Sequence, residues 1–181
     1  MKQEKLIMIN KRTLLILGAG GHGKSVAEAA LLSNQWESIV FADDSWPEKI
    51  EIAGFPIIAK IAGICDVKAD VSAAIPAVGN NQLRKDWFAM LKELDIPLAT
   101  VLHPTAIVSR SARIGDGVSI MAGSVIGVDV KVGDGVIINL LSAIDHDAKI
   151  GDFSHLRVGV LVAGGVVIEP LTFLAAGTVL A

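Results

Sequence analysis

A histidine between two aspartates is the group in this chain best suited to acid–base chemistry. His146 stands in the segment Asp145-His146-Asp147. A neutral imidazole near pH 7 can take a proton from an amine or a hydroxyl. An adjacent carboxylate can fix the tautomer of the ring and stabilise the imidazolium that forms. His146 is therefore a candidate general base, and the alternative is a surface histidine flanked by solvated carboxylates.

A glycine-rich loop near the N-terminus is a candidate phosphate-binding site. The segment Gly18-Ala19-Gly20-Gly21-His22-Gly23 fits G-x-G-x-x-G, and Asp43 follows at the end of the next predicted strand. Such a loop presents backbone N–H groups and a helix N-terminus to phosphate. Taken alone, the motif predicts a dinucleotide-dependent oxidoreductase. A tight strand-to-helix turn without a ligand is the alternative.

The first half of the chain reads as a small α/β domain, over residues 1–100. Short apolar runs predict strands at 13–17, 38–42 and 73–78, and helical spacing predicts helices at 24–33 and 82–94. Strands that alternate with helices favour a parallel sheet with helical crossovers. The glycine loop would then lie between the first strand and the first helix of a Rossmann-like fold.

The second half, residues 101–181, follows a six-residue period. Every sixth residue from Leu102 to Leu180 is aliphatic, and the residue four places after each is small or β-branched. This period is typical of a parallel β-helix, in which each hexad forms one face of a triangular prism. Three hexads, or 18 residues, make one coil, and successive coils stack about 4.8 Å apart. An ordinary β-sandwich would need period-2 alternation and irregular turns instead.

Two further residues are separated from His146 by a whole coil and by half a coil. Gly164 comes one coil later, where its backbone N–H could hydrogen-bond a thioester carbonyl and the oxyanion formed from it. His155 comes half a coil later, across the prism from His146 in the same chain. If both histidines line one pocket, that pocket lies between two subunits. Otherwise His155 is a simple interface or surface residue.

Composition excludes several classes of protein. The net charge of -3 gives no basic face, so nucleic acid is not an expected partner. Cys65 is the only cysteine, which is compatible with a reducing compartment. No apolar run is long enough to span a membrane, and the short run after Lys2 and Lys5 makes a poor signal peptide. We expect a cytoplasmic protein without membrane insertion.

The whole chain resembles the bacterial acetyltransferases that modify nucleotide-linked amino sugars for glycan assembly, together with their relatives that O-acetylate sialic acid. Their repeat is the hexapeptide left-handed β-helix. The segments that carry the resemblance are Gly18 to Gly23, Ala42-Asp43-Asp44, Val78-Gly79-Asn80-Asn81 with Arg84, His103-Pro104, Ile144 to Asp147 and Ile150 to His155.

This resemblance implies an acetyl-CoA-dependent, trimeric enzyme without a metal. It implies that His146 is the general base, that Asp147 supports it, that His155 lies in the same interfacial site, and that the Gly164 amide contacts the acetyl carbonyl. It also implies that the N-terminal domain binds a nucleotide sugar instead of NAD. The substrate-binding residues would be Gly20, Gly21, His22, Gly23, Asp43, Asp44, Gly79, Asn80, Asn81 and Arg84.

The end of the chain departs from the family pattern. Family members continue past the hexads into a closing segment, whereas this chain stops at Ala181, directly after Leu180. An uncapped β-helix exposes unpaired strand edges. We therefore expect a C-terminally truncated β-helix with weakened acetyl-CoA binding and activity.

Four other functions remain open. The main expectation is N-acetylation of a nucleotide-linked amino-deoxy-sugar, and O-acetylation of a sugar such as sialic acid is its nearest alternative. An NAD-dependent oxidoreductase would leave the β-helix unexplained. A metal-dependent hydratase on the same fold needs three histidine ligands, and only His146 and His155 lie within the coils past the junction. The last alternative is an inactive, oligomerising scaffold.

Overall fold

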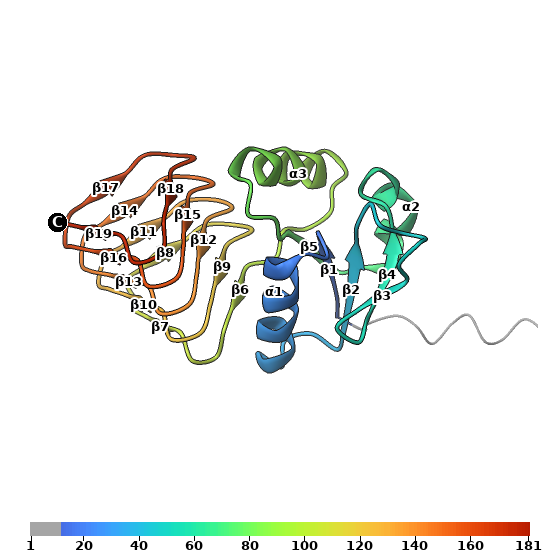
Figure 1. The fold of residues 1–181 in the computed structure, drawn as a ribbon, viewed down its shortest axis with the longest axis horizontal. Helices are drawn as coiled ribbons and strands as arrows, with labels where there is room; N and C mark the ends of the chain where they lie inside the picture. The colour runs from blue at the N-terminus through green and yellow to red at the C-terminus, as the bar shows by residue number, and fades with distance from the viewer. Residues whose placement is uncertain (1–11) are drawn as a thin grey trace, which may run out of the picture.

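A computed structural model of the protein describes residues 12–181. Residues 1–11, which include the segment assessed as a signal peptide, lie outside the described part. Figure 1 shows two bodies side by side, with the N-terminal α/β half joined to a stack of short strands. The helices α1 (Gly21–Leu32) and α3 (Asn81–Glu93) lie next to the first strands of that stack.

The α/β half is built on a five-stranded sheet of order β3-β4-β2-β1-β5. The strands β1 (Thr13–Leu17), β2 (Ser38–Ala42), β4 (Phe55–Ala59) and β5 (Ala73–Pro76) are parallel, and only β3 (Glu51–Ile52) is antiparallel. This order places β2 and β5 on opposite sides of β1. The strand order thus reverses at β1, and α/β proteins commonly bind ligands outside the carboxyl ends of the strands at such a point.

The helices differ slightly from the predicted ranges. Helix α1 begins at Gly21, three residues before the predicted start, because the last glycines of the loop already adopt helical geometry. Helix α3 begins after Asn80, whose side-chain oxygen accepts the Leu83 N–H at 2.9 Å and so caps the helix. Short helical turns link β4 to β5, namely Ile61–Gly63, α2 (Ile64–Val67) and Lys68–Asp70.

Residues 101 to 180 form a parallel β-helix with three faces. Each strand pairs with the strand 18 residues away, as the register Lys131↔Lys149 illustrates. Aliphatic residues point into the prism and form its own core. Buried serines inside the prism are satisfied by backbone carbonyls, for example Ser142, whose hydroxyl donates to the Arg157 carbonyl at 3.1 Å. The hexad prediction therefore matches the observed coils.

The three faces carry different outward side chains. The covered face lies against the α/β half and consists of β6 (Val101–Leu102), β9 (Ser119–Ile120), β12 (Ile137–Ile138), β15 (His155–Leu156) and β18 (Phe173–Leu174). The apolar face consists of β7 (Ile107–Val108), β10 (Val125–Ile126), β13 (Ala143–Ile144), β16 (Leu161–Val162) and β19 (Val179–Leu180). The basic face consists of β8 (Arg113–Ile114), β11 (Lys131–Val132), β14 (Lys149–Ile150) and β17 (Val167–Ile168).

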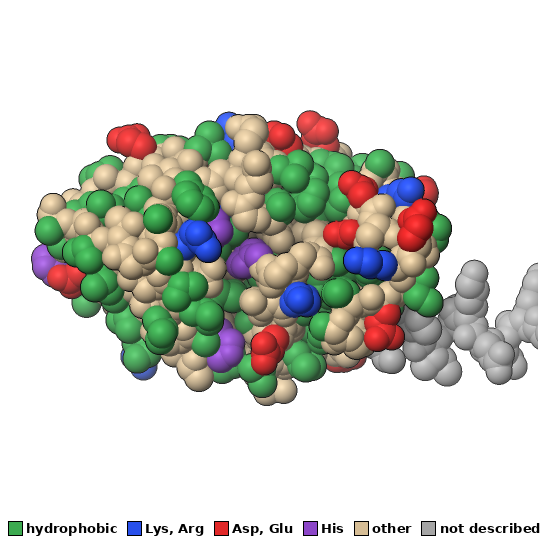
Figure 2. Space-filling view, viewed as in Figure 1, with side chains coloured by type: hydrophobic (Ala, Val, Ile, Leu, Met, Phe, Trp, Pro, Cys, Tyr) green, Lys and Arg blue, Asp and Glu red, His purple; other side chains and the backbone are tan. Residues whose placement is uncertain are grey.

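Charged side chains are unevenly distributed over the molecule. On the surface seen in Figure 2, they gather mainly over the α/β half, whereas the β-helix half shows mostly apolar side chains and backbone. The outward positions of the apolar face are exposed, with Ile107 at 66% and Val179 at 65% of their full accessibility. Large exposed apolar surfaces of this kind mark interaction sites.

Candidate active site

His146 lies at the corner where the chain turns from β13 on the apolar face to β14 on the basic face. Its Nδ1 lies 2.8 Å from Oδ2 of Asp147, and its Nε2 lies 3.8 Å from Oδ2 of Asp145. The imidazole is open to solvent. With Nδ1–H donating to Asp147, the lone pair of the neutral ring is on Nε2, which is then the proton acceptor.

The two carboxylates make His146 more basic. The hydrogen bond to Asp147 raises the pKa of His146 above its usual value of 6.5, and the charge of Asp145 raises it further. A more basic imidazole accepts a proton more readily, although it becomes neutral only at higher pH. His146 and Asp147 are therefore suited to act as a general base and the carboxylate that orients it.

Gly164 leaves open space at the face of this imidazole. A Cβ atom at position 164 would lie 2.6 Å from both Cε1 and Nε2 of His146, so only glycine fits beside the ring as it stands. The neighbouring Gly165 N–H donates to the His146 carbonyl at 2.8 Å, which holds the two turns together. Within residues 12–181, the Gly164 N–H itself has no acceptor. It is therefore available to a carbonyl oxygen bound next to His146.

His155 lies elsewhere, on the covered face. Only 7% of the residue is exposed, and its ring stacks edge-on against Phe173 at 5.3 Å. Its Nδ1 lies 3.2 Å from the Gly79 carbonyl, and its Nε2 is buried without a partner among the described residues. Burial lowers the pKa of His155, and the hydrogen bond to Gly79 offsets this only in part. The imidazole is thus held neutral at the joint between the two halves.

His22, from the glycine loop, is the second histidine of this joint. Its Nε2 lies 3.1 Å from the Ser119 hydroxyl of the covered face, and its ring lies 6.3 Å from that of His155. Burial, together with smaller contributions from His155 and Arg84, lowers the pKa of His22 to about 3. Expected among the substrate-binding residues, His22 points into the protein and ties the loop to the β-helix.

The glycines of the loop divide into structural and open positions. Gly18 has a φ of +97°, and a Cβ at Gly23 would collide with the Gly18 carbonyl, so both serve the tight strand-to-helix turn. Gly20 and Gly21, by contrast, have space around them, because a Cβ added at either would meet nothing within 4 Å. These two positions at the start of α1 remain accessible to a ligand.

Asp43 and Asp44, the acidic residues after β2, accept hydrogen bonds from nearby backbone N–H groups. Asp43 accepts the Ala19 N–H at 2.7 Å through one carboxylate oxygen, and the Ser45 N–H and hydroxyl through the other. Burial would raise the pKa of Asp43, but these hydrogen bonds outweigh it and lower the pKa. Asp44 is exposed, and one of its oxygens accepts the Ile61 N–H at 3.2 Å. Asp44 therefore keeps more capacity for a ligand than Asp43 does.

Arg84 is buried and hydrogen-bonds several segments of the chain to one another. No part of the residue is exposed, and its guanidinium donates to backbone carbonyls of Val78, Gly135, Phe153 and Ser154 and to the side chain of Asn81. Burial lowers the pKa of Arg84 to about 10. The bonds to Gly135, Phe153 and Ser154 fasten α3 to the coils, and substrate binding by Arg84 stays a prediction.

The two asparagines beside Arg84 are also engaged. Asn80 caps α3, and the Asn81 amide donates to the carbonyls of Leu171 and Thr172 at 2.9 and 3.2 Å. Gly79 offers its carbonyl to His155. An open pocket of about 450 Å³ adjoins these residues and is lined by Gly79 to Gln82, Leu171 and Phe173.

Two sets of the expected site residues are therefore separate within one chain, and Gly20, Gly21, Asp43 and Asp44 lie apart from both at the glycine loop and after β2. His146, Asp147 and Gly164 make one exposed corner, whereas His22, Gly79, Asn81, Arg84 and His155 meet at the joint between the halves. His155 and His146 lie on different parts of the prism. Their predicted meeting in one pocket is not formed within the chain and stays a prediction about the assembly.

Sequence reasoning missed two features of this surface. Ser119 and Phe173, the partners of His22 and His155, lie on β9 and β18, and neither belongs to a recognisable motif. A column of basic residues on the basic face was also missed, although an 18-residue comparison of Arg113, Lys131 and Lys149 could have found it.

Known proteins resemble this chain in sequence and in fold. The sequence model of the PglD N-terminal domain matches residues 13–91. UDP-N-acetylbacillosamine N-acetyltransferase from Bacillus subtilis (strain 168) is 34% identical over 115 residues, which cover 61% of this chain and 52% of the relative. The acetyltransferase domain of PglB from Neisseria gonorrhoeae FA1090 superposes with a TM-score of 0.82 at 29% identity, covering 94% of this chain and 91% of that one. The chain is thus similar to nucleotide-sugar acetyltransferases in both sequence and fold.

A second similar solved structure contains CoA and a nucleotide sugar. PerB from Caulobacter crescentus, in complex with CoA and GDP-perosamine, has a TM-score of 0.78 at 27% identity and covers 93% of this chain and 88% of that one. The PglB domain has also been solved with acetyl coenzyme A. These similarities confirm the predicted fold, a Rossmann-like domain followed by a left-handed parallel β-helix. The match spans about half the length of the curated relative.

Metal binding and membrane insertion find no support in the described residues. Among residues 12–181, no three His, Cys, Asp or Glu side chains gather as metal ligands would. In the same range, no helix combines the length and apolar character that crossing a bilayer requires.

Proposed function

We propose that this chain transfers an acetyl group from acetyl-CoA to the amino group of a nucleotide-linked amino-deoxy-sugar. The observation that carries the proposal is the His146–Asp147 pair, with the free N–H of Gly164 stacked against the ring. The named activity of the Bacillus relative and the CoA and GDP-perosamine bound to PerB support the same chemistry. Because the matched part of that relative is about half its length, its substrate is not carried over to this chain.

The reaction follows from the positions of these groups. The sugar amine attacks the thioester carbon of acetyl-CoA, and Nε2 of His146 takes the proton that the amine must lose. Asp147 stabilises the imidazolium that forms. The Gly164 N–H donates to the developing oxyanion. Collapse of the tetrahedral intermediate breaks the C–S bond, and His146 returns the proton to the departing CoA thiolate.

The nucleotide would bind at the carboxyl edge of the α/β sheet. Gly20 and Gly21 leave the N-terminus of α1 open, which suits a diphosphate group. Asp44 stands exposed beside this edge. Asp43, which a dinucleotide-binding domain would turn toward a ribose hydroxyl, bonds Ala19 and Ser45 instead. This arrangement favours a nucleotide sugar over NAD.

A second copy of the chain completes the proposed site. The carboxyl edge of the sheet meets the covered face near His155, whereas His146 lies at the corner between the other two faces. A neighbouring copy that packs through the apolar face would bring its His146 toward the nucleotide held by the first. We propose a homotrimer, because in a closed ring each copy supplies its His146 corner to one neighbour and takes the corner of the other neighbour into its own site. Such an enzyme is expected in the cytoplasm.

Replacing the proposed base tests this function directly. The His146→Ala variant should lose about 10²–10⁴-fold in kcat, the usual contribution of a general base. Its fold should persist, because the side chain is exposed. Turnover is measured with saturating acetyl-CoA and a series of UDP- and GDP-linked amino sugars. His103→Ala is the control, since it removes a histidine outside the site. A kcat within about threefold of the parent, far short of a general base's contribution, would remove His146 from the mechanism.

A further inference from the structure

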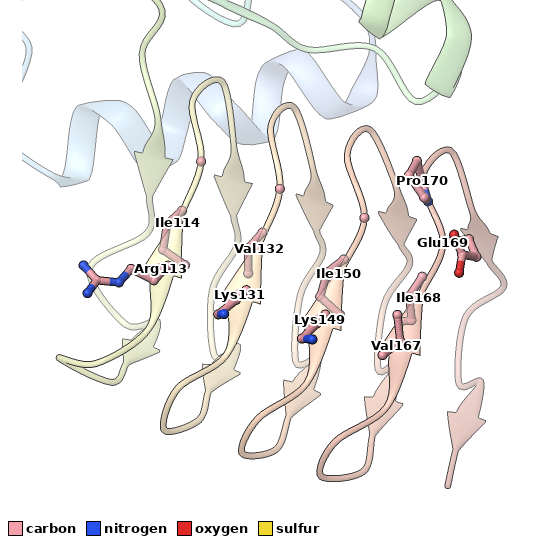
Figure 3. A pocket seen from close by; sticks show the side chains of 13 residues that line it. Arg113, Ile114, Lys131, Val132, Lys149, Ile150, Val167, Ile168, Glu169 and Pro170 are labelled. Atoms are coloured by element: carbon pink, nitrogen blue, oxygen red, sulfur yellow. The ribbon is translucent and has the colours of Figure 1, made fainter.

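A column of three cations runs along the basic face. Arg113, Lys131 and Lys149 occupy the same position in successive coils and are directly paired in register. Neighbouring strands lie about 4.8 Å apart, so the column extends over roughly 10 Å. Figure 3 shows the three residues on successive strands, followed by Val167 in the next coil. All three are exposed.

Such a column of like charges is electrostatically unfavourable unless negative charge lies close to it. Like charges placed opposite each other on adjacent strands repel. Within the described residues, none of the three cations forms an ion pair with a carboxylate. The chain as a whole has a net charge of -3, so the column does not simply reflect a basic protein.

Carboxylates of a neighbouring acidic column accept other hydrogen bonds. Asp116, Asp134 and Asp152 lie three residues after each cation, at the next corner of the prism. The Asp134 carboxylate accepts the Asp116 N–H at 2.9 Å, and the Asp152 carboxylate accepts the Asp134 N–H at 3.0 Å. These two carboxylates are therefore directed along the prism axis to the neighbouring turns and away from the cations.

The cations border an open groove with a flat floor. The groove has a volume of about 450 Å³, and its floor is formed by Gly115, Gly133 and Gly151. Side chains are absent from this floor because the coils stack too closely: a Cβ at Gly115 would lie 2.5 Å from the Asp134 carboxylate. Glu169 and Pro170 close the far end. An extended ligand can thus lie flat along the coils with cations along one side.

One end of the column reaches the proposed active site. Lys149 follows His146 by three residues in the same coil, at the start of β14. Both reactants of the proposed reaction carry a diphosphate group, and phosphate is the partner that exposed Lys and Arg bind best. We propose that Arg113, Lys131 and Lys149 form a phosphate-binding ladder that holds the diphosphate of a co-substrate whose reacting end lies at His146.

This inference rests on the proposed function, and two co-substrates offer the same chemistry. Acetyl-CoA carries a diphosphate and a further phosphate, and the nucleotide sugar bound to a neighbouring copy carries a diphosphate. The ladder would recognise either through its charge, so the experiment separates them by binding each alone.

Calorimetry with the full chain tests the ladder. CoA, UDP and GDP are titrated separately into the parent, into a Lys131→Gln/Lys149→Gln variant and into a Lys85→Gln/Lys92→Gln control, which removes the same charge from exposed positions on α3. The ladder variant should bind CoA, or else the nucleoside diphosphates, about tenfold more weakly, and the salt dependence of that binding should fall. The probe whose binding is weakened in the ladder variant identifies the co-substrate.

Two results would overturn the ladder. One is a ladder variant that binds every probe within about twofold of the control, and the other is a parent chain that binds none of the probes. Turnover is measured on the same samples to keep the two proposals apart. Ladder-dependent binding without turnover would contradict only the proposed acetyl transfer. Normal turnover with ladder-independent binding would contradict only the ladder.

Discussion

At His146, one carboxylate sets both the orientation of the base and the pH at which it works. Asp147 lies 2.8 Å from Nδ1 and is the largest contributor to the raised pKa. A base acts only while it is neutral, so the raised pKa places the acid limb of the pH–rate profile above pH 6.5. The same hydrogen bond that strengthens the base therefore narrows its working range on the acid side.

The Asp147→Asn variant should separate these two effects. Loss of the carboxylate lowers the pKa of His146, so the acid limb should move to lower pH, while kcat on the plateau falls by less than in His146→Ala. The measurement is kcat/KM across pH 5 to 9. Asp129→Asn is the matched control, because Asp129 occupies the same corner one coil earlier with a similar φ of +58°. An acid limb that stays in place or moves to higher pH would contradict the assignment.

At this scale, coil arithmetic on the sequence identified His146, Asp147 and Gly164 as neighbours, and the structure brings them together. The 18-residue period could not show which groups Asp43, Asn81 and Arg84 hydrogen-bond. Each of them has a partner among backbone atoms distant in sequence. A polar residue in a motif can serve either a ligand or the fold, and the sequence does not distinguish the two.

Among the elements, the coils of the β-helix depend on glycines where neighbouring turns touch. A Cβ at Gly133 would collide with the Asp152 carboxylate and lie 2.8 Å from the Asp152 backbone nitrogen. Since backbone cannot move aside without disturbing the next coil, the side chain of even an alanine forces the two turns apart. The stack is thus specified by small residues at the corners as well as by the aliphatic residues inside.

The Gly133→Ala variant should reduce the free energy of unfolding by about 1–3 kcal/mol, the usual cost of overpacking. Gly63→Ala is the control, because a Cβ there meets nothing within 4 Å and the φ of Gly63 is negative. The control should be neutral or slightly stabilising. Urea unfolding followed by circular dichroism gives both values. Equal stabilities for the two variants would show that the corners tolerate a side chain.

The regular elements were predictable from the sequence, and the short irregular ones were not. The strands 13–17 and 38–42 were predicted at their observed bounds, whereas the predicted strand 73–78 ends at Pro76. The hairpin of β3 and β4 was not predicted. Its turn, Ala53-Gly54, has positive φ at both residues, a conformation usually indicated by Asn-Gly or Asp-Gly. An alanine in that position removes the signal.

For the whole molecule, the sequence period determines the prism but does not say which face the α/β half covers. That contact depends on single residues, such as His155 against Gly79 and His22 against Ser119. The period also leaves open what covers the apolar face. Ile107, Val125, Leu161 and Val179 remain 40–66% exposed there, which is more apolar surface than one strand face of a monomer usually shows.

Charge on the apolar face should dissociate the proposed trimer. Leu161 lies on β16, between β13 and β19, and is 45% exposed, so Leu161→Glu should fold but bury a carboxylate in the contact between copies. Sedimentation should give a trimer for the parent and a monomer for the variant, and acetyl transfer should fall with the loss of trimer. A parent that is monomeric at micromolar concentration, or a variant that remains trimeric, would argue against this interface.

The joint between the two halves should make stability depend on pH. Burial lowers the pKa of His22 to about 3 and also lowers that of His155, so the folded state keeps both rings neutral. The unfolded chain takes up a proton at each ring near pH 6.5. Stability is therefore greatest above pH 6.5 and falls as the pH drops, by about 1.4 kcal/mol per pH unit for His22 until the pH nears 3, and His155 adds to this fall.

Replacing one of the two rings should remove its share of this slope. His22→Gln can still hydrogen-bond Ser119 but cannot titrate, so its free energy of unfolding should change less between pH 7 and pH 4.5 than that of the parent. The difference should approach one proton, or about 1.4 kcal/mol per pH unit. His103→Gln, which removes a histidine outside the joint, should keep the parent's slope. The measurement is urea unfolding at several pH values, followed by tryptophan fluorescence, to which Trp36, Trp46 and Trp87 of the same half contribute. Equal slopes for His22→Gln and His103→Gln would show that burial at the joint does not keep His22 neutral.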